Sequence, residues 1–229
     1  IPMAGVPHHA AAGYIQRLVD MGHRVAIAEQ LEDPRQAKGL VKRGIVRIVT
    51  PGVVLDPTAL AAQQANYLVA ICAGGIAFAD LSTGDFRLSA LSPEDAIGEL
   101  HRIEPKEALL APGLDSPGVL AALRRHGTVV SPLDDDAWTH DEASRAVCQA
   151  LGVRDLLGFG VPSDHPAIPA AGALIRYAME VTRTGVRNLH GLVAYQPDGY
   201  MVLDDTTRRN LELTKTLMGG RRKGSLLHL

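Results

Sequence analysis

Three strand-like runs follow one another between residues 66 and 91, and this stretch restricts the possible folds more than any other. The runs NYLVAICA, GIAFADLS and DFRLSAL consist mostly of apolar residues. Gly74-Gly75 and Thr83-Gly84 separate the runs, and both pairs are hairpin signals. The stretch therefore predicts three antiparallel strands that are neighbours in one sheet.

Helical and extended segments alternate after these strands. An antiparallel meander followed by βαβα units predicts an α/β mixed sheet with helices on its faces. This order is characteristic of an RNase H-like domain. Asp134 is expected to cap the third helix. We expect helices at 93–103, 117–126, 134–151 and 167–183, and extended segments at 107–111 and 128–132.

The chain before residue 58 resembles an incomplete domain. Residues 8–21 predict a helix that ends at Gly22, and residues 23–30 and 45–52 predict strands with a polar loop between them. One helix and two strands are too little to close a sheet. We therefore expect residues 1–57 to be part of a larger α/β domain.

The last forty residues begin another unit. Residues 192–204 predict a hairpin that turns at Pro-Asp-Gly, and a helix is expected to start at the N-cap residues Asp204 and Asp205. An apolar stripe runs along this helix, and Gly219-Gly220 ends it. Little chain follows to pack against the stripe, so we expect an excised piece of a longer protein. The stripe comprises Leu211, Thr214, Leu217 and Met218.

Composition narrows the functional classes. The formal net charge is −2, so any contact with nucleic acid must be local. No apolar run approaches the ~20 residues of a membrane span, and we expect no membrane partner. Cys72 and Cys148 have no metal-ligand spacing and suggest no disulfide framework. We therefore expect a cytoplasmic protein.

The common catalytic motifs are missing from the sequence. The segment GGRRKGS at 219–225 contains Gly, Lys and Ser in the wrong order for a phosphate loop. No nucleophile elbow occurs, and His8 and His9 lack the spacing of a metal pair on a helix. The sequence therefore predicts no catalytic residue and no metal ligand.

One alternative function is an RNase H-like, metal-dependent nuclease. Such nucleases keep a carboxylate on the first hairpin of the sheet, and Asp80 follows an apolar strand there. Asp85 follows nearby, but the only other acidic cluster, Asp134–Asp136, resembles a helix cap. The competing interpretation is that Asp80 and Asp85 flank a turn, are solvated and bond to its backbone.

A basic set lies in the first 57 residues. It has two interpretations, a solvated loop face or a contact with phosphates that positions a protein without reading bases. The set comprises Arg35, Lys38, Lys42, Arg43 and Arg47.

Four stretches resemble the MutS family of bacterial DNA mismatch-repair proteins, and the resemblance covers essentially the whole chain. They are PMAGVPHHAAAGYIQRLV, VAIAEQLEDPRQAKGLVKRGIVRIVTPG, RDLLGFGV, and LDDTTRRNLEL with GGRRKGSLL. The resemblance implies three domains. Residues 1–57 would be the second half of a mismatch-recognition domain, 58–187 an RNase H-like connector domain, and 188–229 the start of a helical core, or lever, domain.

The resemblance also implies which functions this chain lacks. The family reads a mispair with a Phe-x-Glu motif, and no Phe here has a Glu two residues later. The ATPase domain, with its ATP and Mg²⁺, also lies outside the chain. We therefore expect a non-catalytic fragment with no cofactor, taken from a cytoplasmic, nucleoid-associated homodimer that binds mismatched duplex DNA.

Site residues follow from the resemblance for two contacts. Met3, Ala4 and Gly5 would lie near the minor groove, where an apolar side chain suits a kinked step. The basic loop of the family matches Lys38, Lys42 and Arg43.

The connector domain of the family docks MutL, and the expected helix 134–151 offers a surface for it. Val147, Leu151 and Ala143 would face inward. The exposed residues would then be Glu142, Arg145 and Gln149.

Overall fold

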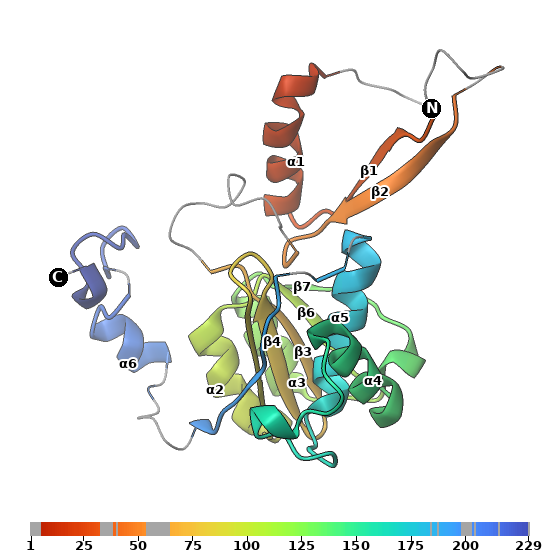
Figure 1. The fold of residues 1–229 in the computed structure, drawn as a ribbon. Helices are drawn as coiled ribbons and strands as arrows, with labels where there is room; N and C mark the ends of the chain where they lie inside the picture. Colours follow the sequence, from red (N-terminus) through yellow and green to blue (C-terminus); the bar gives the residue numbers. More distant parts are fainter. Residues whose placement is uncertain are drawn as a thin grey trace.

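The structure is a computed structural model, and it contains two sheets of different size (Figure 1). Two strands form the smaller sheet and six strands form the larger one. Within the described residues, no helix is long and apolar enough to cross a membrane. The structure describes residues 6–32, 39, 41–53, 65–183, 185–186, 188–197, 203, 205–214 and 216–228.

The six-stranded sheet has the order β7-β6-β3-β4-β5-β8. β3, β4 and β5 form the expected antiparallel meander, and β6 pairs parallel with β3. β7 and β8 add parallel strands at the two edges. The predicted mixed sheet is therefore confirmed. Its strands are β3 (Leu68–Cys72), β4 (Gly75–Asp80), β5 (Asp85–Ser89), β6 (Glu107–Leu110), β7 (Val129–Val130) and β8 (Val193–Ala194).

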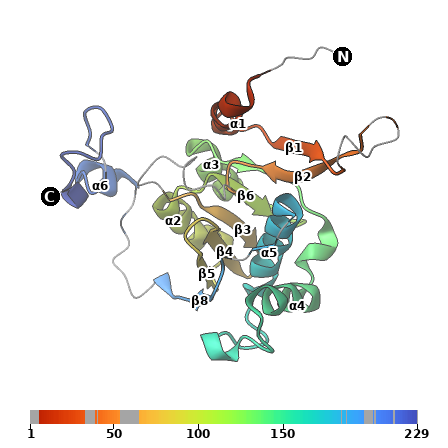
Figure 2. The same ribbon diagram turned by 45° about the horizontal axis from the view of Figure 1, so that its top comes forward.

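Helices cover both faces of this sheet (Figure 2). α2 (Pro93–Ile103) and α3 (Pro117–Arg125) pack on one face. α4 (His140–Leu151) and α5 (Ile168–Thr182) pack on the other. Each of α2 and α3 starts with a serine whose hydroxyl accepts an N–H from the first turn and with a proline at the next position, which explains why their starts were predictable.

The expected single helix 134–151 is wrong, because Thr139 divides it. A 3₁₀ helix, η3 (Asp135–Trp138), precedes Thr139, whose backbone is extended at φ −71° and ψ 138°. Asp134 stands at the N-cap of η3, but its side chain makes no cap hydrogen bond. The break turns Ala137 and Trp138 into the core, so burial of these side chains outweighs the continuity of the helix.

The first unit consists of η1 (His8–Ala10), α1 (Ala11–Asp20) and an antiparallel pair, β1 (Val25–Gln30) and β2 (Arg43–Val49). The order of elements is as predicted. Gly22 ends α1 with φ +84°, a conformation that glycine adopts at little cost. Most residues of β1 are exposed, which leaves much of this sheet without a covering layer.

The segment after α5 departs most from expectation. β8 pairs with β5 of the large sheet, and residues 198–202 of the expected hairpin, which include most of its turn, lie outside the described part of the chain. α6 (Asp205–Asn210) ends about two turns before Met218, so the expected long helix is wrong. Leu211, Leu217 and Met218 are exposed, and a short helix without packing is only marginally stable. Two short 3₁₀ turns complete the fold, η4 (Leu157–Phe159) and η6 (Leu226–His228).

Candidate functional site

Exposed basic residues lie at the start of β2 and along it. Arg43 and Arg47 are both exposed on β2, and Ile45 between them is exposed as well. The pairing with β1 is irregular between Ile45 and Arg47, where the register shifts by one residue. Lys42 is also exposed, and its backbone N–H donates to Glu32 at 2.6 Å. The pair therefore presents three cations that can reach phosphates. Met3, Ala4, Gly5, Arg35 and Lys38 lie outside the described residues.

The exposed face of α4 carries the residues expected there. Arg145 and Gln149 are exposed, while Glu142 is partly exposed and accepts from Arg145 at 2.9 Å. Ala143 and Val147 are buried against α5, and Leu151 is half-buried beside the same cluster. An exposed ion pair of this kind contributes at most about 1 kcal/mol to stability. This face is thus a polar surface on a rigid helix.

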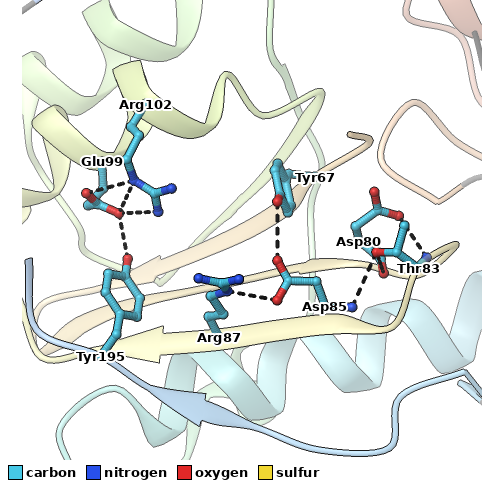
Figure 3. Close-up of polar contacts among 8 residues, drawn as sticks. All are labelled: Tyr67, Asp80, Thr83, Asp85, Arg87, Glu99, Arg102 and Tyr195. Carbon is cyan, nitrogen blue, oxygen red and sulfur yellow. Dashed lines mark hydrogen bonds and ion pairs between the residues drawn. The ribbon is translucent and has the colours of Figure 1, made fainter. Parts of the chain in front are cut away.

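Asp80 is a structural residue of the β4–β5 turn (Figure 3). One oxygen accepts from the backbone and hydroxyl of Ser82 at 2.9 and 2.6 Å, and the other accepts from the backbone of Asn66 at 3.0 Å. Its carboxylate is buried, so the expectation that Asp80 is solvated is wrong, while the expected bonds to the turn are present. Among the described residues, no group of three or more His, Cys, Asp or Glu could hold a metal ion. The nuclease interpretation has no support.

Two tyrosine–carboxylate contacts border the same region of the sheet (Figure 3). The Tyr67 hydroxyl donates to Asp85 at 3.2 Å, and Asp85 also accepts from Arg87 at 2.8 Å. Burial, with the Asp85 charge adding to it, raises the pKa of Tyr67. The expectation that Asp85 is a solvated turn residue therefore misses its partners, Tyr67 just before β3 and Arg87 on β5 itself.

The second contact joins the segment after residue 190 to α2. The Tyr195 hydroxyl donates to Glu99 at 2.7 Å, and Glu99 also accepts from Arg102 at 2.6 Å. Burial and the hydrogen bond to Glu99 raise the pKa of Tyr195 well above its usual range. The rings of Tyr195 and Phe78 also pack edge to face, with their centroids 5.8 Å apart. Sequence patterns gave no sign of this contact.

Glu107 is a third carboxylate that sequence analysis missed. It starts β6, is fully buried, and accepts hydrogen bonds from Thr50 in the first unit and from Tyr177 on α5. Burial, with the Glu107 charge and hydrogen bond adding to it, raises the pKa of Tyr177 well above its usual range. The one available signal was a glutamate at the start of the apolar run ALLA, where a buried charge needs partners.

Comparison with known proteins assigns the chain to a family. Residues 1–58 match the family model for MutS domain I, and residues 66–190 match the model for MutS domain II. Curated relatives named DNA mismatch repair protein MutS align along nearly the whole chain. They include those of Symbiobacterium thermophilum (43% identical, covering 99% of this chain), Syntrophobacter fumaroxidans (39%, 100%) and Syntrophomonas wolfei (38%, 100%).

The chain spans only about a quarter of the length of these relatives: the alignments cover 27%, 26% and 28% of them. The model for domain II alone matches more than half of the chain. The resemblance noted in the sequence is therefore confirmed, and the chain belongs to the MutS family of DNA mismatch repair proteins.

Proposed function

We propose that this chain is a non-catalytic segment of a protein that binds mispaired DNA and couples that binding to ATP hydrolysis. The observation that carries the proposal is the match to two consecutive MutS domains in order. In this proposal residues 1–57 are part of the mismatch-recognition domain, 58–187 connect it to the core, and 188–229 begin the core. ATP and Mg²⁺ act in the longer protein, a cytoplasmic homodimer.

The exposed cations of the β1–β2 pair support a role beside DNA. Lys42, Arg43 and Arg47 can contact phosphates, which position a protein on the duplex but carry no sequence information. The Phe-x-Glu reader of the family is absent from this chain. The chain alone should therefore bind duplex DNA weakly and without preference for a mismatch.

Fluorescence anisotropy with G·T and matched duplexes at one salt concentration tests this expectation. The two affinities should agree within a few-fold, and Arg43→Ala or Arg47→Ala should reduce the salt dependence of binding by about one counterion each. Asp141→Ala, an exposed change on α4, is the control and should leave binding unchanged. A tenfold preference for the mismatch, about 1.4 kcal/mol, would contradict the proposal for this chain.

The exposed face of α4 is our proposed docking surface for MutL. Arg145→Glu replaces the ion pair between Arg145 and Glu142 with two neighbouring negative charges. It also reverses the charge that α4 presents to a partner at this position. MutL affinity should fall at least tenfold in a MutS protein that contains this chain, is bound to mismatched DNA with ATP, and carries Arg145→Glu with Gln149→Ala.

Arg124→Glu is the matched control, because Arg124 is exposed on α3 at the opposite face of the sheet. Both variants should keep their melting temperatures, since exposed substitutions usually change stability by about 0.5 kcal/mol or less. Undiminished affinity in the α4 variant would remove this helix from the interface.

A further inference from the structure

The two parts of the chain that match MutS domains I and II meet at one buried carboxylate. Glu107 lies at the start of β6 and is fully buried. Its Oε2 accepts from the Thr50 hydroxyl at 2.6 Å and from the Gly52 backbone N–H at 2.9 Å. Its Oε1 accepts from the hydroxyls of Ser131 and Tyr177. Oε2 therefore accepts only from the first unit, which matches MutS domain I, and Oε1 accepts only from the second unit, which matches MutS domain II.

The turn that carries Thr50 and Gly52 is packed into the second unit. Thr50 and Val53 form an isolated bridge, and Val53 is buried in the cluster that lies under α4 and α5. A Cβ on Gly52 would lie 2.7 Å from the Cβ of Glu107, so only glycine fits there without a shift. Arg24, which precedes β1, lies 5.7 Å from the centre of the Tyr177 ring on α5. The contact thus extends beyond a single hydrogen bond.

This arrangement makes the orientation of the first unit depend on Glu107. A buried carboxylate is tolerated only when hydrogen bonds satisfy it, and charge-assisted hydrogen bonds are stronger than neutral ones. If the first unit moved away, Oε2 would lose both donors while Oε1 stayed in place. The unsatisfied oxygen opposes that movement.

We propose that Glu107 is a positioning residue, which fixes the mismatch-recognition part of the chain on the connector by giving one carboxylate oxygen to each. The claim that Glu107 joins the two units rests on the hydrogen bonds alone. The claim that this contact affects mismatch binding rests on the proposed function.

Matched variants separate the two oxygens. Thr50→Val removes one donor to Oε2 at nearly constant shape, whereas Ser131→Ala removes one donor to Oε1. Glu107→Gln should largely preserve the joint, that is, the hydrogen-bonded contact between the two units at residue 107. The glutamine carbonyl oxygen can take the place of Oε2 and accept from Thr50 and Gly52. Its amide group can take the place of Oε1 and donate to Ser131 and Tyr177, whose hydroxyls then accept instead of donating. Glu107→Ala leaves all four donors without an acceptor.

Hydrogen exchange at the Gly52 amide, measured by NMR, tests the joint. Exchange relative to wild type should be at least fivefold faster in Thr50→Val and within twofold in Ser131→Ala and Glu107→Gln. Amides of β3 and β4 report the stability of the connector, and they should not change in Thr50→Val. A Gly52 rate that Thr50→Val leaves unchanged would overturn the proposal even if Glu107→Ala fails to fold.

A second measurement addresses DNA. In a MutS protein that contains this chain, Thr50→Val should reduce mismatch preference at least threefold without changing affinity for matched duplex, and Glu107→Gln should retain the preference. If wild type shows no mismatch preference, the proposed function fails while the exchange result stands. If exchange at the Gly52 amide becomes faster in Thr50→Val but mismatch preference is unchanged, the positioning role is overturned.

Discussion

Asp80 shows that a carboxylate in a suggestive place can have a purely structural role. Its two oxygens accept from the backbone of Asn66 and Ser82, which lie at the start of the second unit and in the turn after β4. These bonds tie two separate segments together. A residue that could be catalytic by its position in the sequence thus holds the β4–β5 turn against the segment before β3.

Replacing Asp80 should lower stability and have no effect on metal binding. Asp80→Ala leaves buried N–H donors unpaired and should lower the free energy of unfolding by about 2–3 kcal/mol in urea titrations. Ser89→Ala is the control, because the buried Ser89 hydroxyl has no partner within the described residues, so its removal should not lower the free energy of unfolding. A melting temperature of the wild type that rises with Mg²⁺ would contradict this structural assignment.

Helices differ in how far their limits depend on local signals. α2 starts at Ser92-Pro93, where the serine hydroxyl accepts from Asp95, and its limits match the prediction. α4 is shorter than predicted, because burial of Trp138 interrupts the helix before it. α4 then packs against α5 at Gly172, where an added Cβ would overlap the backbone of Ala143. The close approach of these helices requires glycine.

Two glycine substitutions should therefore have opposite effects on stability. Gly172→Ala forces α4 and α5 apart and should lower the free energy of unfolding by about 1–3 kcal/mol. Gly98→Ala, at an exposed position of α2, has no heavy atom within 4 Å of the new Cβ and should raise it by up to about 1 kcal/mol. Chemical denaturation of both variants measures the difference. Equal stability of the two proteins would show that the helices are not in the contact described.

Three tyrosines in different parts of the fold donate hydrogen bonds to carboxylates. Tyr177 donates to Glu107 where the two units meet, Tyr67 joins the start of β3 to β5, and Tyr195 joins the segment after residue 190 to α2. All three phenols have raised pKa values, mainly because burial disfavours the charged form. Their protonated state is therefore part of the folded structure.

Stability should decline at alkaline pH. Each phenol ionises near pH 10 when unfolded but at a higher pH when folded, so its contribution is complete below pH 10 and is lost as pH rises above it. The free energy of unfolding should fall by up to about 1.4 kcal/mol per pH unit for each group. Tyr177→Phe and Tyr195→Phe should each reduce this slope, whereas Tyr14→Phe on exposed α1 should not. A slope that neither variant changes would exclude these tyrosines as its cause.

Local patterns in the sequence determined most of the secondary structure. Apolar runs separated by Gly74-Gly75 and Thr83-Gly84 predicted β3, β4 and β5, and α2 and α3 were also predicted, with starts that serine and proline fix locally. These signals act within a few residues, so they can be read without knowing the fold. The exposed side of α4 was predictable for the same reason, since the helix period places it, whereas the basic set was identified by its composition and by the family resemblance.

Only the tertiary structure decided which distant residues meet. Glu107 accepts from positions 50, 52, 131 and 177, and no periodicity links these positions. The break at Thr139 and the early end of α6 also depend on packing, because a helix continues where its apolar face is covered and burial can override propensity. Local signals therefore determined the elements, while the burial of particular side chains determined where two helices stop and how the two units are joined.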